Sequence, residues 1–378
     1  MSIYLDNAAT TRVCPEAAEA ALGAMTEVYG NPSSTHRMGR EAKKMLDTAR
    51  SQVSRALGCA PEELFFTSCG SESDNWAIRR GAEYNARHGR HVISSAVEHS
   101  AVLKSLDELE KNGWEVTRLS PRADGSVAAE DVLAALRPDT ALITLMLVQN
   151  ETGAVTDFAA IAKAVRAENP HTLLHCDAVQ GFLKVPFSAK TLGADMISIS
   201  GHKVHAPKGV GALYIRKGLN LPPFLLGGGQ ENGRRAGTES LPLIAAFGAA
   251  CEAARQDFPA YSERLAALRQ HAVDRLTAEN EGLLILGGGA PQILSLSLPG
   301  WRSEVLMNFL EARDIFVSKS SACKKGGRSY VLEELHLPAK VIDGALRVSF
   351  SRFTTAEEVD ALCDALRDAR ASLRSSIR

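Results

Sequence analysis

Several common signals are missing from this sequence of 378 residues. The formal net charge is −1, whereas a nucleic-acid-binding protein usually carries a basic excess or a basic tract. The alanine-rich run over residues 16–25 is far too short to cross a bilayer. The first residues lack the charged segment followed by an apolar segment that marks a signal peptide. We therefore expect a cytoplasmic protein that binds neither nucleic acid directly nor a membrane.

The cysteines lack any spacing that marks a framework. There are seven of them, no two are spaced C-x-x-C, and no cluster of Cys and His has zinc-finger spacing. An odd number of cysteines in a cytosol-like chain argues against a disulfide framework. We expect no metal site, and most of the cysteines should be core or incidental residues.

What the sequence does contain is an alternation of strands and helices. Hydrophobic residues make up 45% and charged residues 23%, which is ordinary for a globular protein with a real core. Short apolar runs predict strands over 63–68, 91–96, 141–148, 172–178, 195–200 and 209–215, with helical stretches such as 73–86 and 158–168 between several of them. This pattern predicts an α/β fold with a mostly parallel sheet covered on both faces. Active sites of such sheets lie at the carboxyl ends of the strands.

The composition changes after the last of these strands. Residues 221–237 are rich in Gly, Pro and charge, which predicts a loop, and helical stretches follow over 243–255 and 261–278. The rest of the chain predicts a smaller α/β unit, with strands over 292–300, 315–320 and 344–351 and helices over 303–314 and 356–373.

Lys203 follows the carboxyl end of a predicted strand. It lies in the stretch SISGHKVHAPKGVG, between a histidine and a turn rich in Gly and Pro. Asp177 and Gln180 lie at the end of the strand 172–178. A pyridoxal phosphate site needs a lysine for the Schiff base and an acid that holds the pyridine nitrogen protonated. A surface lysine in a turn is the alternative, because most lysines are exposed.

Two further strand ends carry polar residues. Ser71 lies in FFTSCGSESDN, between a strand and a helix, and Asp74 three residues on suits a helix N-terminus. Free backbone N–H groups at such a terminus bind phosphate, although an ordinary capped helix explains the stretch equally well. His99 follows the strand 91–96, where an imidazole can stack on a cofactor or move protons.

Cys323 has mostly polar and charged neighbours in the sequence, which is unusual for a structural cysteine. The stretch SSACKKGGR surrounds it with serines, glycines and cations. Cationic neighbours lower the pKa of a thiol, and the thiolate is the reactive form. By itself the stretch also fits an incidental surface cysteine.

In combination these stretches resemble a known family. The motifs YLDNAATT, NPSSTHRMGREA, FFTSCGSESDNWAI, EHSAVL, QNETGAV, HCDAVQ, SGHKVHAPKGVGALYI, RRAGTES, SSAC and LRVSFSRFTTAEEVD occur in that order, from about Tyr4 to Asp360. They resemble the NifS/IscS type of cysteine desulfurase, within the class V aminotransferase group of fold-type I pyridoxal phosphate enzymes.

The resemblance implies an activity and a role for each motif residue. The reaction would take sulfur from L-cysteine, leaving L-alanine and a persulfide on Cys323. The catalytic residues would be Cys323, Lys203 and His99. The cofactor pyridoxal phosphate would be held by Lys203, Asp177, Gln180, His99, Gly70, Ser71, Asn150, Ser200, His202 and, from the neighbouring subunit of a homodimer, Thr238. The substrate would be bound by Arg347 and Asn150, with Asn7 and Ala8 nearby.

The resemblance also implies a division of the chain. Residues 15–255 would form a large cofactor-binding domain, and residues 1–14 with 256–378 a small domain that carries the cysteine loop. Only five residues separate Cys323 from the motif SYVLEEL, a shorter loop than in many relatives. The sulfur acceptor would be an iron–sulfur scaffold or a tRNA-thiolating enzyme. Cys69 puts a second thiol near the phosphate turn, where a small residue filling a tight turn is the simpler interpretation.

Two other classes of function remain open from the sequence. Another class V enzyme, such as a selenocysteine lyase or a small-amino-acid transaminase, would need no persulfide loop, so the SSACKKGG stretch argues against it. A non-catalytic sulfur-relay or scaffold protein on the same fold would not need Lys203, Asp177 and His99.

Overall fold

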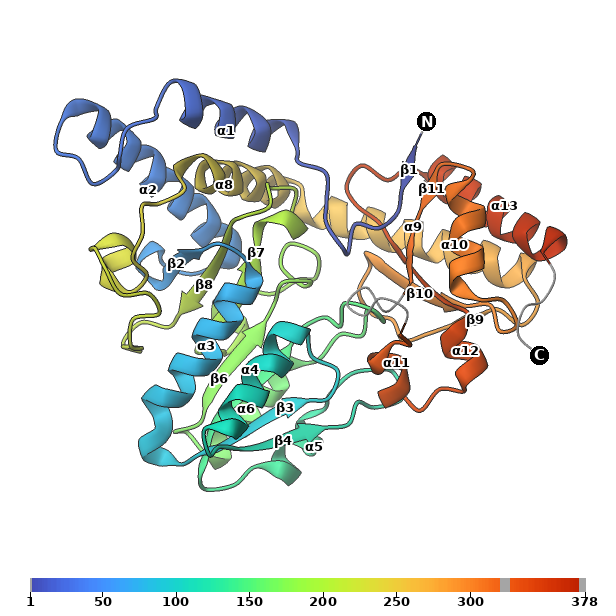
Figure 1. The fold of residues 1–378 in the computed structure, drawn as a ribbon, viewed down its shortest axis with the longest axis horizontal. Coiled ribbons are helices and arrows are strands. Elements are labelled where there is room, and N and C mark those ends of the chain that lie inside the picture. Colours follow the sequence, from blue (N-terminus) through green and yellow to red (C-terminus); the bar gives the residue numbers. More distant parts are fainter. Residues whose placement is uncertain (1, 320–326, 374–378) are drawn as a thin grey trace.

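The computed structural model describes residues 2–319 and 327–373, so the predicted nucleophile Cys323 lies outside the described residues. The larger part of the molecule is built on a seven-stranded sheet (Figure 1). Its strands are β2 (Leu64–Thr67), β3 (His91–Ser95), β4 (Glu115–Leu119), β5 (Thr140–Met146), β6 (Leu173–Asp177), β7 (Met196–Ser200) and β8 (Gly211–Ile215).

The order of these strands is β2-β8-β7-β6-β5-β3-β4. The neighbours from β7 to β4 are parallel, and β8 runs antiparallel to both β7 and β2. The carboxyl ends of β3, β5, β6 and β7 therefore meet at one edge of the sheet, where ligands bind in open α/β sheets. The predicted α/β class with a mostly parallel sheet is confirmed.

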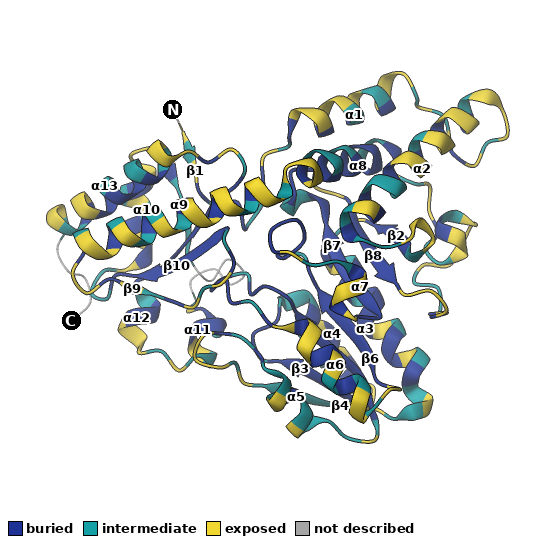
Figure 2. Cartoon of the chain, turned by 180° about the vertical axis from the view of Figure 1, so that it is seen from behind, coloured by how far each residue is buried: buried dark blue, intermediate teal, exposed yellow. Residues whose placement is uncertain are grey.

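Helices cover both faces of this sheet because its strands are apolar on both sides. Phe65 packs in one cluster with Trp76 and Leu106, whereas its neighbour Phe66 packs in another with Leu46 and Phe247. Such alternation along a strand is what a sheet between two helical layers requires. Figure 2 shows the strands of this sheet buried except for the edge strand β4, and the helices exposed along one side. The helices of this part are α1 (Pro15–Thr26), α2 (Arg37–Leu57), α3 (Gly70–Asn85), α4 (Ser100–Lys111), α5 (Ala129–Ala135), α6 (Phe158–Glu168), α7 (Ala189–Leu192) and α8 (Leu241–Gln256).

A second, smaller sheet has the order β12-β13-β10-β9 and is antiparallel. A separate parallel pair joins β1 to β11, which brings the N-terminal residues to this part of the molecule. Its own apolar cluster includes Leu5, Leu265, Leu296 and Leu366. The elements are β1 (Ile3–Tyr4), α9 (Phe258–Glu279), β9 (Leu284–Ile285), β10 (Ile293–Ser297), α10 (Ser303–Glu311), β11 (Ile315–Phe316), β12 (Ser318–Lys319), α11 (Tyr330–Glu334), α12 (Ala339–Asp343), β13 (Ala345–Ser349) and α13 (Ala356–Ser372).

The structure differs from the predicted elements in several places, including the edge strand β4, which no predicted strand covers. The single strand predicted over 315–320 is two short strands, because β11 pairs with β1 whereas β12 pairs with β13. The long helix α2 was not predicted, although its buried residues recur at helical spacing from Ala42 to Leu57. The helix α3 begins at Gly70, and its N-cap is Cys69, whose side chain makes no capping bond. The predicted domain boundaries remain a prediction.

Across residues 2–319 and 327–373, no helix combines the length and apolar character that crossing a bilayer demands.

Candidate active site

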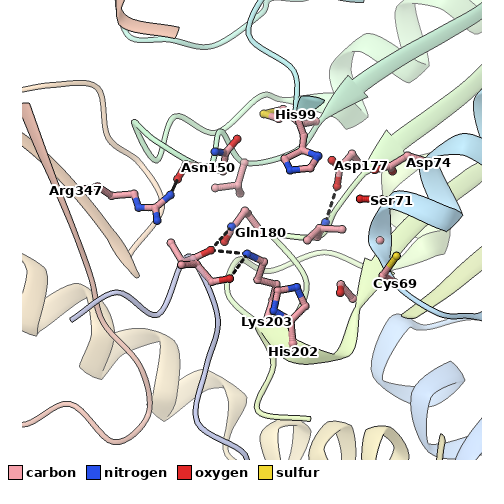
Figure 3. Close-up of a pocket in the computed structure, with 17 residues that line it drawn as sticks. Cys69, Ser71, Asp74, His99, Asn150, Asp177, Gln180, His202, Lys203 and Arg347 are labelled. Atoms are coloured by element: carbon pink, nitrogen blue, oxygen red, sulfur yellow. Dashed lines mark hydrogen bonds between the residues drawn. The ribbon is translucent and has the colours of Figure 1, made fainter. Parts of the chain in front are cut away.

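A cavity of about 320 Å³ opens at the carboxyl edge of the large sheet (Figure 3). Its walls come from the ends of β5, β6 and β7, the start of α3, the N-terminal segment and β13 of the small sheet. The lining residues are Ala8, Ala9, Cys69, Gly70, Ser71, Asp74, His99, Met146, Val148, Asn150, Asp177, Val179, Gln180, Ser200, His202, Lys203 and Arg347. Residues that are far apart in the sequence thus meet in one site between the two sheets.

One end of the cavity is suited to a phosphate group. The first N–H groups of α3, at Gly70 and Ser71, have no acceptor within the helix and carry its positive dipole end. A Cβ atom at Gly70 would meet Cγ2 of Val179 at 2.7 Å, so a side chain there would crowd the space in front of these groups. Ser200 is buried, and its Oγ has no hydrogen-bond partner among the described residues. A buried hydroxyl of this kind needs a partner, and a phosphate oxygen supplies one.

Lys203 reaches the cavity from a short 3-10 turn, Gly201–Lys203, that directly follows β7. Its Nζ donates hydrogen bonds to the carbonyl oxygens of Ala8 at 2.5 Å and Ala9 at 2.8 Å. Burial, with a smaller contribution from the cations Arg347 and Lys184, lowers the pKa of Lys203 to about 7. The amine is therefore substantially uncharged at neutral pH, which a nucleophilic or proton-accepting lysine requires.

Asp177 ends β6 deep in the same cavity and is 5% exposed. Its Oδ1 accepts a hydrogen bond from the backbone N–H of Val179 at 2.9 Å. Burial raises the pKa of Asp177, and the nearby imidazole of His99 acts in the opposite direction. A buried carboxyl of this kind gains from a cation placed beside it, because the charged form is otherwise poorly solvated.

His99 stands opposite Asp177 at the start of α4 (Figure 3). Its Nδ1 accepts a hydrogen bond from the backbone N–H of Ala101 at 3.2 Å. The neutral ring therefore carries its proton on Nε2, since only an unprotonated nitrogen can accept. Burial lowers the pKa of His99, which favours this neutral form.

Asp74 lines the cavity next to Asp177 (Figure 3) and is 1% exposed. Burial, followed by the charge of Asp177, raises the pKa of Asp74 well above its usual value. This aspartate is therefore part of the buried wall, and the sequence-based view of it as a helix-terminal acid is wrong. The first-turn acid is Glu72, which accepts a hydrogen bond from the backbone N–H of Ser68 at 2.8 Å.

The other end of the cavity carries a guanidinium and two amides. Nη1 of Arg347 donates to the Asn150 carbonyl oxygen at 2.9 Å, and Nη2 donates to Oδ1 of Asp6 at 2.9 Å. Its Nε is buried without a partner among the described residues. Gln180 donates from Nε2 to the Ala8 carbonyl oxygen at 2.9 Å. The side-chain oxygens of Asn150 and Gln180 are buried and unpaired within the described part of the chain. The guanidinium of Arg347 therefore suits an anion such as a carboxylate, whereas the two amide oxygens need hydrogen-bond donors.

Most of the described residues singled out from the sequence line this cavity, and two of them, Asn7 and Thr238, do not. Asn7 lies beside it, but its amide donates to the backbone oxygens of Tyr4 and Ser349. Thr238 is exposed and borders a separate cavity with Phe66 and Arg235. Cys323 lies outside the described residues. Sequence reasoning did not single out the apolar wall of Met146, Val148 and Val179, because such residues are indistinguishable from core in a sequence.

The lining fits pyridoxal phosphate. The apolar wall and the imidazole of His99 line the same cavity, Asp177 is a buried acid for a ring nitrogen, and Lys203 is a partly uncharged amine. The start of α3 and the unpaired hydroxyl of Ser200 suit its phosphate. The site thus has each kind of group that this cofactor needs from a protein.

Comparison with known proteins agrees with this geometry. Residues 3–362 match the family model described as "Aminotransferase class-V", a family that depends on pyridoxal phosphate. The chain is 40% identical to a cysteine desulfurase IscS of Methanosarcina thermophila, over 99% of this chain and 93% of the relative. A solved NifS-like protein superposes with a TM-score of 0.93 at 36% identity, covering 99% of this chain and all of that one. A structure titled "SspA in complex with cysteine" has a TM-score of 0.82 at 31% identity, covering 94% of this chain and all of that one. The chain therefore belongs to the class V aminotransferase family, among the cysteine desulfurases of the NifS and IscS type.

Proposed function

We propose that this cysteine desulfurase uses the cavity residues described above to take sulfur from L-cysteine and pass it to Cys323. The observation that carries the proposal is the convergence of Lys203, Asp177 and His99 on one cavity that also contains the N-terminus of α3. The proposal assigns one task to each group, and the tasks follow from the chemistry of the side chains.

The cofactor would be held at three points. Lys203 would attach it covalently, Asp177 would pair with its ring nitrogen, and the start of α3 with Ser200 and His202 would bind its phosphate. His99 would stack on the ring and Gln180 would contact the ring oxygen. When bound, pyridoxal phosphate withdraws electrons from the substrate carbon that carries the amino group.

Lys203 and His99 are placed to move protons. Because the pKa of Lys203 is lowered to about 7, its amine can take the Cα proton of the substrate at neutral pH once it is free. His99 carries a proton on Nε2, since Nδ1 accepts the backbone N–H of Ala101. This arrangement provides one base and one acid in the same cavity.

Arg347 is suited to the substrate carboxylate. A guanidinium binds a carboxylate at two points, which a lysine cannot do. Its side chain is 2% exposed, and its bonds to Asp6 and to the Asn150 carbonyl fix its direction. Asn150 and the segment around Ala8 would complete this subsite.

The sulfur step would then use Cys323. Its thiolate attacks the sulfur of the substrate, so that an S–S bond forms while the C–S bond breaks. The electron pair of the C–S bond stays with Cβ, which is then protonated, and the products are L-alanine and a persulfide on the protein. L-cysteine and one protein thiol are thereby converted to L-alanine and one persulfide, with no external oxidant or reductant.

The position of Thr238 bears on the partners of this chain. Thr238 is exposed and does not line this chain's own cavity, which supports its proposed role at the phosphate of the neighbouring subunit in a homodimer. A protein would take the persulfide sulfur, either an iron–sulfur scaffold or a tRNA-thiolating enzyme. Copurification of the chain with its partners distinguishes these two acceptors.

Production of alanine from L-cysteine tests the function. The wild type should form alanine and persulfide in equal amounts in the first turnover. Cys323→Ser should keep the cofactor and lose both products, because a hydroxyl cannot form a persulfide. Full alanine production by Cys323→Ser would instead favour a lyase or transaminase, which uses no protein thiol.

A further inference from the structure

Two hydrogen bonds join the start of α11 to the large sheet. The hydroxyl of Ser329 donates to Oε2 of Glu151, and the hydroxyl of Tyr330 donates to the backbone oxygen of Glu98. Ser329 also caps α11 by accepting from the backbone N–H of Leu332 at 3.1 Å. The residues at the beginning of this helix are therefore attached to a part of the molecule more than 170 positions away in the sequence.

Both partners sit directly beside cavity residues. Glu98 immediately precedes His99, and Glu151 immediately follows Asn150. Because the chain is continuous, each bond fixes α11 relative to a wall of the active site. The carbonyl of Asn150 in turn accepts from Arg347 of β13 at 2.9 Å, so the contact region spans both sheets.

The Ser329 half of the attachment is buried on both sides, whereas Tyr330 is half-buried. Ser329 is 3% exposed, Glu151 is 4% exposed and Glu98 is 1% exposed. Burial raises the pKa of Glu151 to about 7, and the Ser329 hydrogen bond and the charge of Arg347 act in the opposite direction. Glu98 accepts a further bond from the Ser95 hydroxyl at 2.6 Å, which holds its own position. Hydrogen bonds in such surroundings are costly to leave unmade.

The position of this attachment in the sequence matters. Cys323 precedes Ser329 by six residues. Six residues of fully extended chain span at most about 20 Å. An attachment at Ser329 therefore puts an upper limit of about 20 Å on the distance from Ser329 to the residue that bears the thiol. A tether of limited length raises the effective concentration of the group it carries.

We propose that Ser329 and Tyr330, through Glu151 and Glu98, are positioning residues that keep the segment bearing Cys323 within reach of the substrate. This inference rests on the proposed function, since it concerns the sulfur step. The two hydroxyls thus have a role in the transfer of sulfur to Cys323 and none in binding the cofactor or the substrate.

Three variants separate this role from folding. Ser329→Asp keeps a capping oxygen for α11 but replaces the donor by a carboxylate that faces Glu151. Tyr330→Phe removes only the hydroxyl. Lys340→Gln is the matched control, because it changes an exposed side chain on the neighbouring helix α12 and leaves both hydroxyls in place.

Two measurements on the holoenzyme test the proposal. The first is the single-turnover rate at which labelled sulfur from L-cysteine reaches Cys323, with cofactor occupancy and the KM for cysteine measured in parallel. The second is hydrogen exchange of the peptide over residues 330–334 without substrate. Ser329→Asp and Tyr330→Phe should each slow transfer by about tenfold, the effect of one buried hydrogen bond. Both should speed exchange, with cofactor occupancy and KM unchanged, and Lys340→Gln should match the wild type.

The outcomes are distinguishable. If the double variant Ser329→Asp/Tyr330→Phe transfers sulfur within twofold of the wild-type rate, the positioning role is wrong. If the wild type itself forms no persulfide on Cys323, the proposed function fails. In that case hydrogen exchange still decides whether the attachment exists, and unchanged exchange in the double variant overturns it.

Discussion

Lys203 should combine with pyridoxal phosphate at a much lower pH than an ordinary lysine does. Attachment requires the uncharged amine. With a pKa of about 7, roughly half of Lys203 is uncharged at pH 7, whereas an amine with the ordinary value of 10.5 is uncharged in roughly one molecule in three thousand. At neutral pH Lys203 should therefore react with pyridoxal phosphate about a thousandfold faster than it would if its pKa had the ordinary value.

The assay begins with protein from which the cofactor has been removed. Pyridoxal phosphate is added between pH 5 and pH 10, the adduct is trapped with borohydride, and the mass of the peptide that contains Lys203 gives the extent of reaction. The rate should rise with pH and reach its midpoint near pH 7, because the amine loses its proton as the pH passes its pKa. Nα-acetyl-lysine under the same conditions provides the reference for an exposed amine.

A second variant tests the cause of the shift. Lys184 is buried and contributes to the lowered pKa of Lys203. Replacing it by Met removes this charge and keeps an apolar side chain of similar length, so the midpoint should move to higher pH. A wild-type midpoint above pH 9 would refute the reasoning, because burial would then have left the amine largely charged. If the midpoint of Lys184→Met lies below that of the wild type, the proposed effect of the Lys184 charge on the pKa of Lys203 is refuted, but the effect of burial is not.

Three further outcomes follow from the structure. Asp177→Asn should lower alanine production by at least about a hundredfold with the cofactor still covalently attached, because a neutral amide cannot hold the ring nitrogen protonated, and unchanged turnover would contradict this. Sedimentation should show a dimer, and a fully loaded, active monomer would remove the proposed role of Thr238. Arg50→Met should lower the free energy of unfolding in urea by about 3 kcal/mol, because Arg50 forms a two-point ion pair with the buried Glu231. A loss below about 0.5 kcal/mol, as at an exposed pair, would show that the pair is not effectively buried.

Much of the site could be predicted from the sequence because its residues follow strand ends. Lys203 comes directly after β7 and Asp177 ends β6, so the parallel order of these strands is enough to bring them together. The start of α3 was displaced in the prediction because Ser71 and Asp74 look like a capped start. In the fold the helix begins one residue before Ser71, and Asp74 turns inward to the cavity.

Other features could not be predicted from local patterns. The contact of Lys203 with Ala8 and Ala9 depends on the path of the N-terminal segment across the sheet edge, which is set by the pairing of β1 with β11. The attachment of Ser329 to Glu151 joins residues 178 positions apart. A sequence shows which residues can form such bonds, but the partner is fixed only by tertiary packing. By contrast, the apolar residues of α2 recur at helical spacing, so the sequence alone is sufficient to predict this helix.

We propose above all that sulfur leaves L-cysteine by transfer to Cys323. The most direct measurement is incubation of the holoenzyme with sulfur-labelled L-cysteine, followed by mass spectrometry of its cysteine-containing peptides before any acceptor is added. We expect one labelled persulfide per chain on the peptide that contains Cys323, and alanine in equal amount. Label on Cys69, which lines the cofactor cavity, or alanine without any protein persulfide, would contradict it.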